Sequence, residues 1–332
     1  LGFPVGLIEQ HIGGLERVGP ETWLQIQTGR RLDLEDILDL YGEFLPIPNR
    51  GRAPRKLSPW LEEFPKQFDV RLIEAQRLLN VSERRRHMHP DMPFSFEPAV
   101  ASYSRELAGK IQEKQAQYGT FSQQLDSTFP TRVLQKNPGA SATVEQLASK
   151  LHELEEHRQR IIQAGLLTKD PQATPILGPE RQVDESTKGI LSLYAEDVEN
   201  KLSVFGEIAA KIELFKELVN KRFTYKQLNV ERQHGFQLSS TTGLPLLPTD
   251  LSSGEQHELV LLYELLFRTK PNALILIDEP ELSLHVAWQV EFLKDLERVI
   301  KLSSFDVILA THSPQIINNR WDLTEELQGP QA

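Results

Sequence analysis

The hydrophobic and polar positions in the first part of the chain predict short strands followed by one long helix. Residues 1–68 are rich in Gly and Pro, and within them only Leu32–Tyr41 has apolar residues at helical spacing, so the rest is predicted to form loops and short strands. The apolar run Val70–Ile73 predicts a buried strand. Apolar residues then recur at near-helical spacing from Pro98 to about Asp126, which predicts one amphipathic helix, and Pro130 is expected to end it.

The middle of the chain has the alternating three- and four-residue spacing of a heptad repeat, which is typical of helices that pack side by side. The first run consists of Val144, Leu147, Leu151, Leu154, Arg158 and Ile161. The second run consists of Leu191, Ala195, Val198, Leu202, Phe205, Ala209, Ile212, Lys216 and Val219. Prolines interrupt the gap Gly165–Ser186, so this gap is not predicted to be helical. We expect the two runs to fold back on each other as an antiparallel coiled-coil hairpin.

From residue 223 the pattern is that of a compact α/β domain. A hairpin is predicted around Ser239–Gly243, where two apolar runs flank a Gly-containing loop. A helix, a strand, a second helix and a second strand follow, at Ser253–Phe267, Ala273–Ile277, Val286–Leu302 and Val307–Ala310. This order implies two parallel strands joined by a right-handed crossover. Both strands are unbroken apolar runs, so we expect helices to cover both faces of their sheet.

Composition and charge limit the classes of function. The chain has 37 Lys and Arg residues against 47 Asp and Glu residues, a net charge of -10, and this disfavours a generic nucleic-acid binder, which needs a basic surface to neutralise phosphates. It has no Cys, so disulfides, thiolate zinc sites and cysteine nucleophiles are excluded. No apolar run reaches the roughly 18 residues that a membrane helix needs, and no apolar leader is visible. We therefore expect a cytoplasmic protein with no membrane partner.

Polar residues follow both of the predicted parallel strands. Asp278 and Glu279 come directly after the first strand, and Thr311 and His312 after the second. Because open α/β sheets bind their ligands at the carboxyl edge of the strands, we expect these side chains to converge. Asp278 there suits Mg²⁺, which is held by one or two carboxylates with phosphate oxygens and waters, while Glu279 could polarise a water and His312 could bond a terminal phosphate. The alternative is an acidic pair that only precedes a helix and a histidine that only caps one.

A third element is the predicted helix start after Leu251. The segment Leu251–Gln256 reads Leu-Ser-Ser-Gly-Glu-Gln, with Ser252 placed as the N-cap and with free backbone N–H groups that suit an anion. Taken alone, Ser-Ser-Gly followed by Glu is a common way to begin a helix, and that structural alternative stays open.

Together the three motifs resemble the C-terminal half of an ABC-type ATPase head. Leu251–Gln256 is similar to the signature motif, Leu274–Pro280 to the Walker B strand with its catalytic glutamate, Leu284–His285 to the D-loop, and His312 to the switch histidine. The resemblance implies an α/β fold, a P-loop NTPase of the ABC-ATPase type, in which the antiparallel coiled-coil helical hairpin is an insertion.

The same resemblance implies that the protein binds and hydrolyses ATP with Mg²⁺. Glu279 and His312 match the catalytic residues of the family, and Asp278 matches its magnesium ligand. The spacing also fits, since Asp278 follows Gly254 by 24 residues and His312 follows Asp278 by 34. The residues that match nucleotide-contacting positions, some of them serving an opposing subunit, are Ser252, Ser253, Gly254, Glu255, Gln256 and His285. A homodimer or a higher even-numbered oligomer that associates through the heads is therefore expected.

Further residues resemble a narrower branch, which includes the overcoming-lysogenization and repair ATPases and, closest, the ATPase subunits of Septu-type and retron-associated anti-phage systems. The similarity to the branch is carried by Pro280–His285 and Thr311–Pro314. The similarity to the anti-phage subunits is carried by Gly254–Leu259, Ala287–Gln289, Trp321–Leu323, Thr28–Gly29 and Phe129–Arg132. This branch implies a separate nuclease effector as the partner, and it leaves room for nucleic acid, DNA or retron RNA/DNA, in the assembled complex.

The sequence departs from the family's pattern at the phosphate-binding loop. No segment reads G-x-x-x-x-G-K-[ST], so the Walker A loop and its lysine are absent. The family carries this loop near its N-terminus and the chain begins with Leu1 instead of Met, so we expect the loop in a preceding segment. The expected domains are an incomplete N-terminal part of the ATPase head at 1–135, the helical coiled-coil insertion at 136–222, and the C-terminal ATPase lobe at 223–327.

Two other functions stay open at this point. One is a DNA-clamping ATPase of the SMC and repair type, in which the coiled coil organises DNA. The other is an ATPase-dead scaffold, which the missing phosphate-binding loop favours. The basic cluster Arg84–His89 could meet nucleic acid or a partner, although a solvated loop is the simpler interpretation.

Overall fold

The computed structural model describes residues 15–19, 22–25, 31–34, 36–37, 69–74, 78–83, 94–135, 143–168, 184–282 and 284–326. The chain forms two compact units. The smaller unit comprises Leu1–Phe68 and Leu79–Ala99, and the larger comprises Asp69–Leu78 and Val100–Ala332. The basic cluster at 84–89 lies outside the described residues.

The smaller unit contains short antiparallel strands, which the sequence predicted for residues 1–68 but not for residues 79–98. One sheet has the order β1-β2-β3, and β5 and β6 form a separate pair. Leu32 lies in β3 and is buried, so the predicted helix does not begin there, and only Leu34, Asp36 and Ile37 are helical among the described residues of that stretch. The strands are β1 (Leu15–Gly19), β2 (Thr22–Gln25), β3 (Arg31–Asp33), β5 (Leu79–Glu83) and β6 (Phe94–Pro98).

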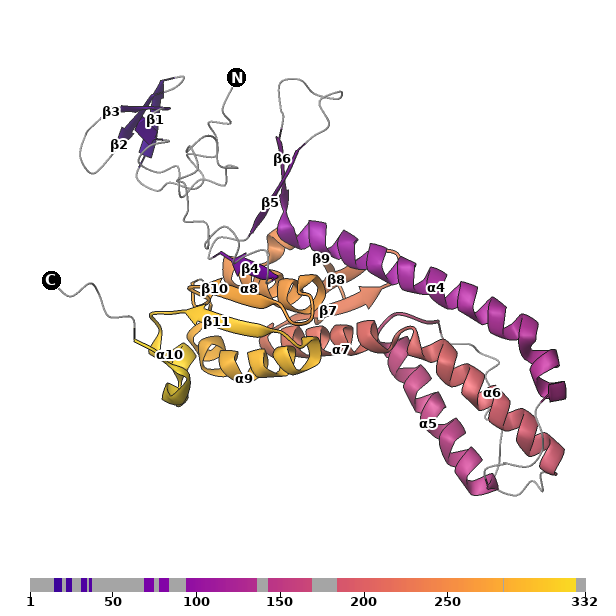
Figure 1. The fold of residues 1–332 in the computed structure, drawn as a ribbon. Helices are drawn as coiled ribbons and strands as arrows, with labels where there is room; N and C mark the ends of the chain where they lie inside the picture. Colours follow the sequence, from indigo (N-terminus) through magenta and orange to yellow (C-terminus); the bar gives the residue numbers. More distant parts are fainter. Residues whose placement is uncertain are drawn as a thin grey trace, which may run out of the picture. The chain divides into compact units, whose positions relative to one another are not determined.

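The larger unit has two three-stranded sheets with helices packed around them (Figure 1). Its strands are β4 (Val70–Ile73), β7 (Lys226–Glu231), β8 (Gly235–Ser240), β9 (Pro245–Leu246), β10 (Leu274–Asp278) and β11 (Asp306–Ala310). Its helices are α4 (Ala99–Gln135), which begins at the boundary between the units, α5 (Val144–Gln163), α6 (Glu185–Ser203), α7 (Gly206–Arg222), α8 (Ser253–Tyr263), α9 (Val286–Ser303) and α10 (Pro314–Ile317). Shorter turns are the 3-10 segments η2 (Pro248–Asp250) and η4 (Trp321–Leu323) and the π-helical segment η3 (Glu264–Arg268), which extends α8.

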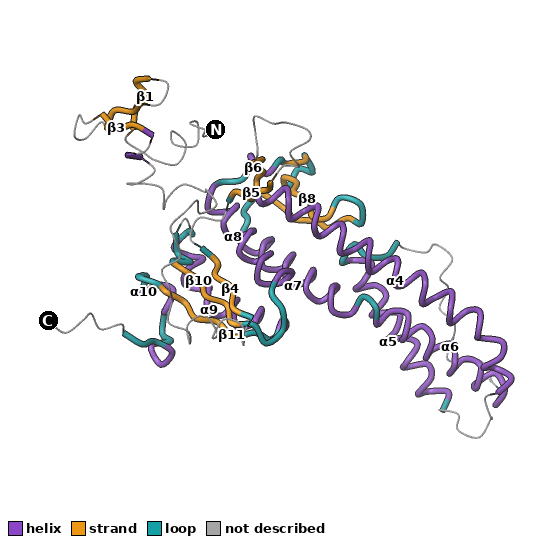
Figure 2. The backbone as a smooth tube through the Cα atoms, turned by 45° about the horizontal axis from the view of Figure 1, so that its top comes forward, coloured by secondary structure: helices purple, strands orange, loops and turns teal. Residues whose placement is uncertain are grey.

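The parallel pair predicted from the sequence is confirmed. β10 lies between β4 and β11 and runs parallel to both (Figure 2). The helix between β10 and β11 is α9, as predicted, and the hairpin around Ser239–Gly243 joins β8 to β9. The strand β7 was not predicted, and it pairs antiparallel with β8 along its whole length.

One face of the parallel sheet is open among the described residues. Leu72, Leu276 and Ile308 lie in one row across the three strands, and Leu72 and Ile308 are 55% and 58% exposed. On β10, Ile275 and Ile277 point the other way and are buried. The expectation that helices cover both faces was therefore wrong for the described residues, because a single crossover helix between two neighbouring strands lies on one face only.

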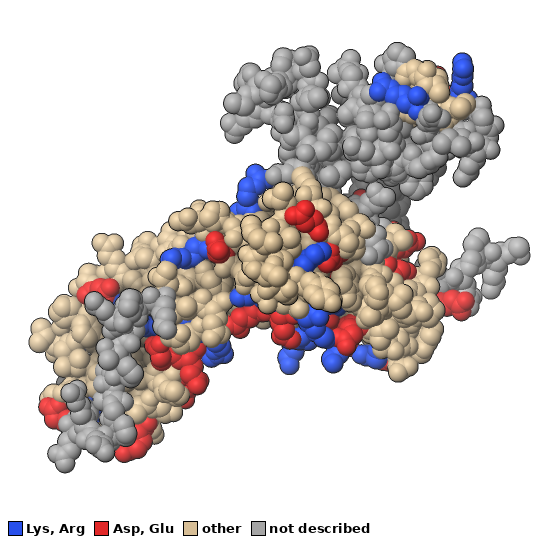
Figure 3. Space-filling view, turned by 180° about the vertical axis from the view of Figure 1, so that it is seen from behind, with Lys and Arg blue, Asp and Glu red and all other residues tan. Residues whose placement is uncertain are grey.

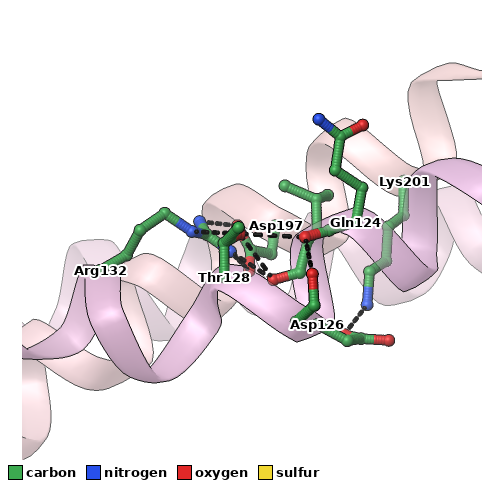
Figure 4. Close-up of polar contacts among 8 residues, drawn as sticks. Gln124, Asp126, Thr128, Arg132, Asp197 and Lys201 are labelled. Atoms are coloured by element: carbon green, nitrogen blue, oxygen red, sulfur yellow. Dashed lines mark hydrogen bonds and ion pairs between the residues drawn. The ribbon is translucent and has the colours of Figure 1, made fainter.

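Helix α4 does not stop at Pro130, contrary to the prediction. Pro130 lies inside the helix, which continues to Gln135. Proline has no N–H to donate to the preceding turn, which normally weakens a helix. Here the Arg132 side chain donates a hydrogen bond to the Leu125 carbonyl at 2.8 Å and also binds Asp197 of α6, so contacts on both sides of the proline hold the helix (Figure 4).

Helices α5 and α6 run parallel, which corrects the expected antiparallel hairpin. Lys150 of α5 forms an ion pair with Glu199 of α6 at 2.7 Å, and Lys216 of α7 donates to the Gln163 carbonyl at the end of α5 at 2.9 Å. Residue numbers therefore rise in the same direction along both helices. The intervening gap of about 20 residues can span up to roughly 60 Å when extended, twice the length of a 20-residue helix, so its length permits a parallel return.

The antiparallel partner of α6 is α4. Tyr118 packs against Phe205 with ring centroids 5.1 Å apart, and farther along α4 Arg132 binds Asp197. As the number rises on α4 it falls on α6, and the two helices lie side by side in Figures 1 and 2. The heptad spacing thus identified α5 as a helix that packs against α6, but not the direction of α5 or the additional contact of α6 with α4.

Two features fix these helices to the lobe that follows. Gly165 has a φ of 80°, and a Cβ there would lie 2.1 Å from the Val230 carbonyl oxygen, so only glycine fits where α5 ends against β7. An aromatic cluster joins α4, α7, β8 and α8 with its π-helical extension, and its members are Tyr103, Phe215, Phe236, Tyr263 and Phe267.

Two further features of the described residues are their surface charge and the hydropathy of their helices. On the face shown in Figure 3, most of the described Lys and Arg side chains of the larger unit lie near Asp and Glu side chains. Among the described helices, none is both long and apolar enough to cross a membrane.

Candidate functional site

The carboxyl edge of the parallel sheet brings together residues from two neighbouring strands. Asp278 is the last residue of β10 and pairs in register with Ala310, the last residue of β11. The next residue, Glu279, donates its backbone N–H to the Ala310 carbonyl at 2.9 Å. His312 follows two residues after β11. Asp278 and His312 are exposed and Glu279 is half-buried, so all three can meet a ligand at this edge.

Glu279 has an unusual backbone conformation. Its φ is 41°, in the left-handed region that side-chain-bearing residues rarely adopt. Such a conformation costs on the order of 1–3 kcal/mol and persists only where the surrounding structure imposes it, often at functional sites. The bond from Glu279 N–H to Ala310 and the buried Pro280 that follows supply that constraint. The fold therefore holds Glu279 at a fixed place beside Asp278.

Glu281 is a residue of this edge to which the sequence analysis gave no role. One of its carboxylate oxygens accepts a hydrogen bond from the Thr311 hydroxyl, and the other accepts one from the backbone N–H of His312, both at 2.8 Å. The carboxylate thus joins the segment after β10 to the segment after β11. The sequence signal that could have pointed to Glu281 was its position inside the Pro280–His285 motif.

His285 lies at the start of α9 and acts there as the N-cap. Its Nδ1 accepts a hydrogen bond from the Ala287 N–H at 3.2 Å, and its ring lies 6.3 Å from that of Trp288. The side chain is exposed. Its position next to the buried Leu284 fits the expected D-loop, although the contacts it makes are those of a helix cap.

The start of α8 is a capping box. Ser252 is the N-cap, its Oγ accepts from the Glu255 N–H at 3.3 Å, and its backbone N–H donates to the Glu255 carboxylate at 2.7 Å. The Ser252 hydroxyl also donates to that carboxylate at 2.9 Å. Ser252 is nevertheless exposed, so an anion that approaches α8 would compete with Glu255 for its hydroxyl.

Lys226 of β7 neutralises this carboxylate, and the sequence gave no signal for its role. Its Nζ lies 2.6 Å from Glu255 Oε2. Burial raises the pKa of the Glu255 carboxyl, but the hydrogen bonds from Lys226 and Ser252 outweigh burial and leave the pKa below its usual value. Glu255 is therefore a charged residue that holds the helix start.

The remaining residues of the signature-like motif have local roles. Ser253 is exposed and Gly254 half-buried, and the Gln256 side chain donates to the Leu251 carbonyl at 3.0 Å. In the described part of the chain, no recorded contact joins the start of α8 to Asp278, Glu279 or His312. One copy of the chain therefore brings the strand-edge residues together, while the hydrogen bonds of Ser252 are with Glu255 of the same helix start.

The donor set at the strand edge fits a magnesium ion that a nucleotide helps to hold. No group of three or more His, Asp or Glu residues suited to a metal occurs among the described residues. Mg²⁺ does not need such a group, because it keeps several waters and is held by one or two carboxylates together with phosphate oxygens. The exposed carboxylate of Asp278, at the end of β10, meets that requirement.

Comparison with known families decides the class of the chain. The model of an AAA domain, described as "putative AbiEii toxin, Type IV TA system", matches residues 16–318. The chain belongs to this AAA domain family. It therefore has an AAA-type ATPase domain of mixed α/β structure, and the strand edge with Asp278, Glu279 and His312 lies within the matched residues.

Other comparisons add less to the AAA domain assignment. No curated protein matches the chain. Among solved structures, the chain is similar to the Smc head domain with an extended coiled coil bound to the C-terminal domain of ScpA, from Pyrococcus furiosus. The similarity has 15% sequence identity, covers 92% of this chain and 69% of that chain, and has a TM-score of 0.28, which is too low to support an argument about this AAA domain.

Proposed function

We propose that the protein is an ABC-type ATPase subunit that binds ATP with Mg²⁺ and hydrolyses the nucleotide. The observation that carries the proposal is the register of β10 and β11, because Asp278, Glu279 and the segment of His312 meet at one strand edge. The AAA family membership and the order of the motifs support it.

Each residue at the edge has a distinct role in this proposal. Asp278 holds the magnesium ion, which when bound supplies positive charge next to the phosphates. Glu279 accepts a proton from, or polarises, the attacking water, and its constrained backbone keeps the carboxylate in place. His312 donates a hydrogen bond to the terminal phosphate.

The test is a pair of substitutions in the full-length protein. Glu279→Gln keeps the size of the side chain but removes the base, so we expect turnover to fall by about 10²- to 10⁴-fold while ATP binding is retained. Asp278→Ala should instead weaken binding of magnesium and nucleotide. Wild-type turnover in Glu279→Gln would remove Glu279 from this role. Glu325→Gln, at an exposed position, is the matched control.

The complete site is proposed to form between two copies. Ser252 is exposed at the start of α8, and its recorded contacts are with Glu255, not with the strand edge of its own copy. A second copy that presents its α8 start to the nucleotide would supply Ser252 and Gly254 together with backbone N–H groups, which suit a phosphate. This arrangement predicts a homodimer or a higher even-numbered oligomer.

We further propose that the ATPase regulates a separate nuclease in anti-phage defence, as in the Septu-type and retron-associated systems whose motifs it resembles, and that it works in the cytoplasm. The net charge of -10 supports a division of labour, because the chain lacks the basic excess of a strong nucleic-acid binder. Purification with the products of neighbouring genes should recover a stable complex that contains a nuclease. Nuclease activity of the purified ATPase alone, absent from an inactive variant, would contradict the proposal.

A further inference from the structure

A closed ring of hydrogen bonds joins the three segments around the proposed ATP site. Thr311 donates to the Glu281 carboxylate at 2.8 Å, and its hydroxyl oxygen accepts from the Ser313 N–H at 3.0 Å. The Ser313 hydroxyl donates to Gln289 Oε1 at 2.8 Å. The Gln289 amide then donates back to the carbonyls of Leu284 at 3.1 Å and Glu281 at 3.4 Å. The ring ties the segment after β10, the first turns of α9 and the segment after β11.

The Glu281 carboxylate is the member of this ring that reaches His312. It accepts the His312 backbone N–H at 2.8 Å with the oxygen that Thr311 does not use. A carboxylate can accept both bonds because it carries two acceptor oxygens and needs no donor partner. Hydrogen bonds to an ionised acceptor are shorter and about twice as strong as neutral ones. Glu281 is half-buried and its bond from Thr311 is partly shielded from water, whereas its bond from the His312 N–H is exposed, so the ionised acceptor is what strengthens the second bond.

The surroundings of His312 show why such an anchor matters. The His312 side chain is exposed at a position that follows the last strand of the sheet, where β11 no longer constrains the backbone. Only four residues form α10, the next helix. The bonds that Glu281 accepts, one from the Thr311 hydroxyl and one from the His312 backbone N–H, therefore hold this segment next to the segment after β10.

We propose that Glu281 is a positioning residue, which fixes the His312 backbone so that the imidazole faces the nucleotide. Gln289 extends the ring to the Leu284–His285 segment, because it bonds both Ser313 and the Leu284 carbonyl. The position of His312 therefore depends on this segment, which is expected to contact the second copy. The expected effect of Glu281 on ATP turnover rests on the proposed ATPase function. The hydrogen bonds of Glu281 with Thr311 and His312 do not depend on that function.

The first experiment observes His312 directly. The chain has nine His residues, so protein labelled with ¹⁵N-histidine gives at most nine backbone amide signals, and His312→Gln identifies the one of interest. In Glu281→Ala we expect the His312 amide to shift upfield and to exchange with solvent about tenfold faster or more, since a bond to a charged acceptor is lost. Glu281→Gln keeps one acceptor and should give an intermediate change. Glu325→Ala, at an exposed position, should change none of the signals.

The other His signals report whether the variants fold, so a misfolded Glu281→Ala would be recognised, and Glu281→Gln would then supply the test. An unchanged His312 amide in folded Glu281→Ala would overturn the inference.

The second experiment measures ATP turnover, where Glu281→Ala should lower kcat with little change in KM, and Glu281→Gln should recover part of it. A shifted His312 signal with normal turnover would overturn the role in positioning the catalytic imidazole. A wild-type protein that hydrolyses no ATP would instead overturn the proposed function while the amide measurement still decides the assigned bonds.

Discussion

Arg132 of α4 forms two hydrogen bonds with the Asp197 carboxylate of α6, at 2.5 and 2.7 Å (Figure 4). Asp197 is buried, and the pair lies just beyond Pro130, where α4 lacks a backbone donor. The hydrogen bonds that Arg132 donates to Asp197 raise the pKa of the Arg132 guanidinium, which keeps the pair charged. This pair fixes α6 as the antiparallel partner of α4.

The pair should therefore be more important for stability than an exposed pair between the same group of helices. Arg132→Met leaves the buried Asp197 carboxylate without its cation, so we expect a lower melting temperature. Adding Asp197→Asn should recover part of the loss, because it removes the unpaired charge. Lys150→Met is the control, since Lys150 and Glu199 are both exposed. Equal effects of Arg132→Met and Lys150→Met on the melting temperature would show that the pair has no special role.

A second prediction concerns a buried ion cluster that joins α7, α8 and α9. Arg222 of α7 forms ion pairs with Glu258 of α8 and with Asp295 of α9, and all three side chains are buried. Removal of one partner leaves buried unpaired charge, which typically costs 3–5 kcal/mol. Arg222→Met should lower the free energy of unfolding by about that amount in urea titrations.

The matched control for Arg222→Met is an ion pair at the surface that joins two of these helices, α7 and α9. Arg298 of α9 makes two hydrogen bonds to Glu217 of α7, and its side chain is 40% exposed. Surface pairs contribute about 0–1 kcal/mol, so Arg298→Met should be close to wild type. If the two variants lose equal stability, burial of the Arg222 cluster is not the source of its effect.

A third prediction concerns pH and the start of α8. The folded-state pKa of Glu255 lies below its usual value of 4.5, since the bonds from Lys226 and Ser252 favour the charged form against the opposing effect of burial. A lowered pKa gives stability that is present above about pH 4.5 and is lost as the pH falls through the folded-state value. Wild type should exceed Glu255→Gln in stability most at pH 7, and the difference should shrink below pH 4. A difference that is constant or grows with acid would refute this assignment, and Glu325→Gln is the control.

Local signals in the sequence were enough to predict most of the C-terminal lobe. The apolar runs of β10 and β11, the capped start of α8 at Ser252 and the amphipathic α9 were each visible within a few residues. The strand β7 carried a usable signal too, because Leu228 and Val230 alternate with polar residues, and both are buried. Local pattern therefore identified elements and, through their order, the strand edge that carries Asp278 and His312.

Long-range pairing was not predictable in the same way. The heptad spacing of α5 and α6 correctly predicts that they pack against each other, but it does not show in which direction they run or that α4 also contacts α6. The ion pair of Arg132 with Asp197 joins residues 65 positions apart, and that of Lys226 with Glu255 joins residues 29 apart. Neither ion pair can be predicted from the local pattern of apolar and polar residues. Glu281 was visible as part of a motif, but its bond to the His312 backbone depends on the distance between two strand ends.

The measurement that tests the central claim most directly is ATP turnover in a mixture of two inactive variants. In a two-fold symmetric pair of heads, each site takes Glu279 from one copy and Ser252 from the other, so a mixed pair of Glu279→Gln and Ser252→Ala keeps one intact site. Each variant alone should be slow, and an equimolar mixture that exchanges subunits should regain up to about a quarter of wild-type turnover. A mixture that stays as slow as its two components would contradict an ATP site shared between two copies.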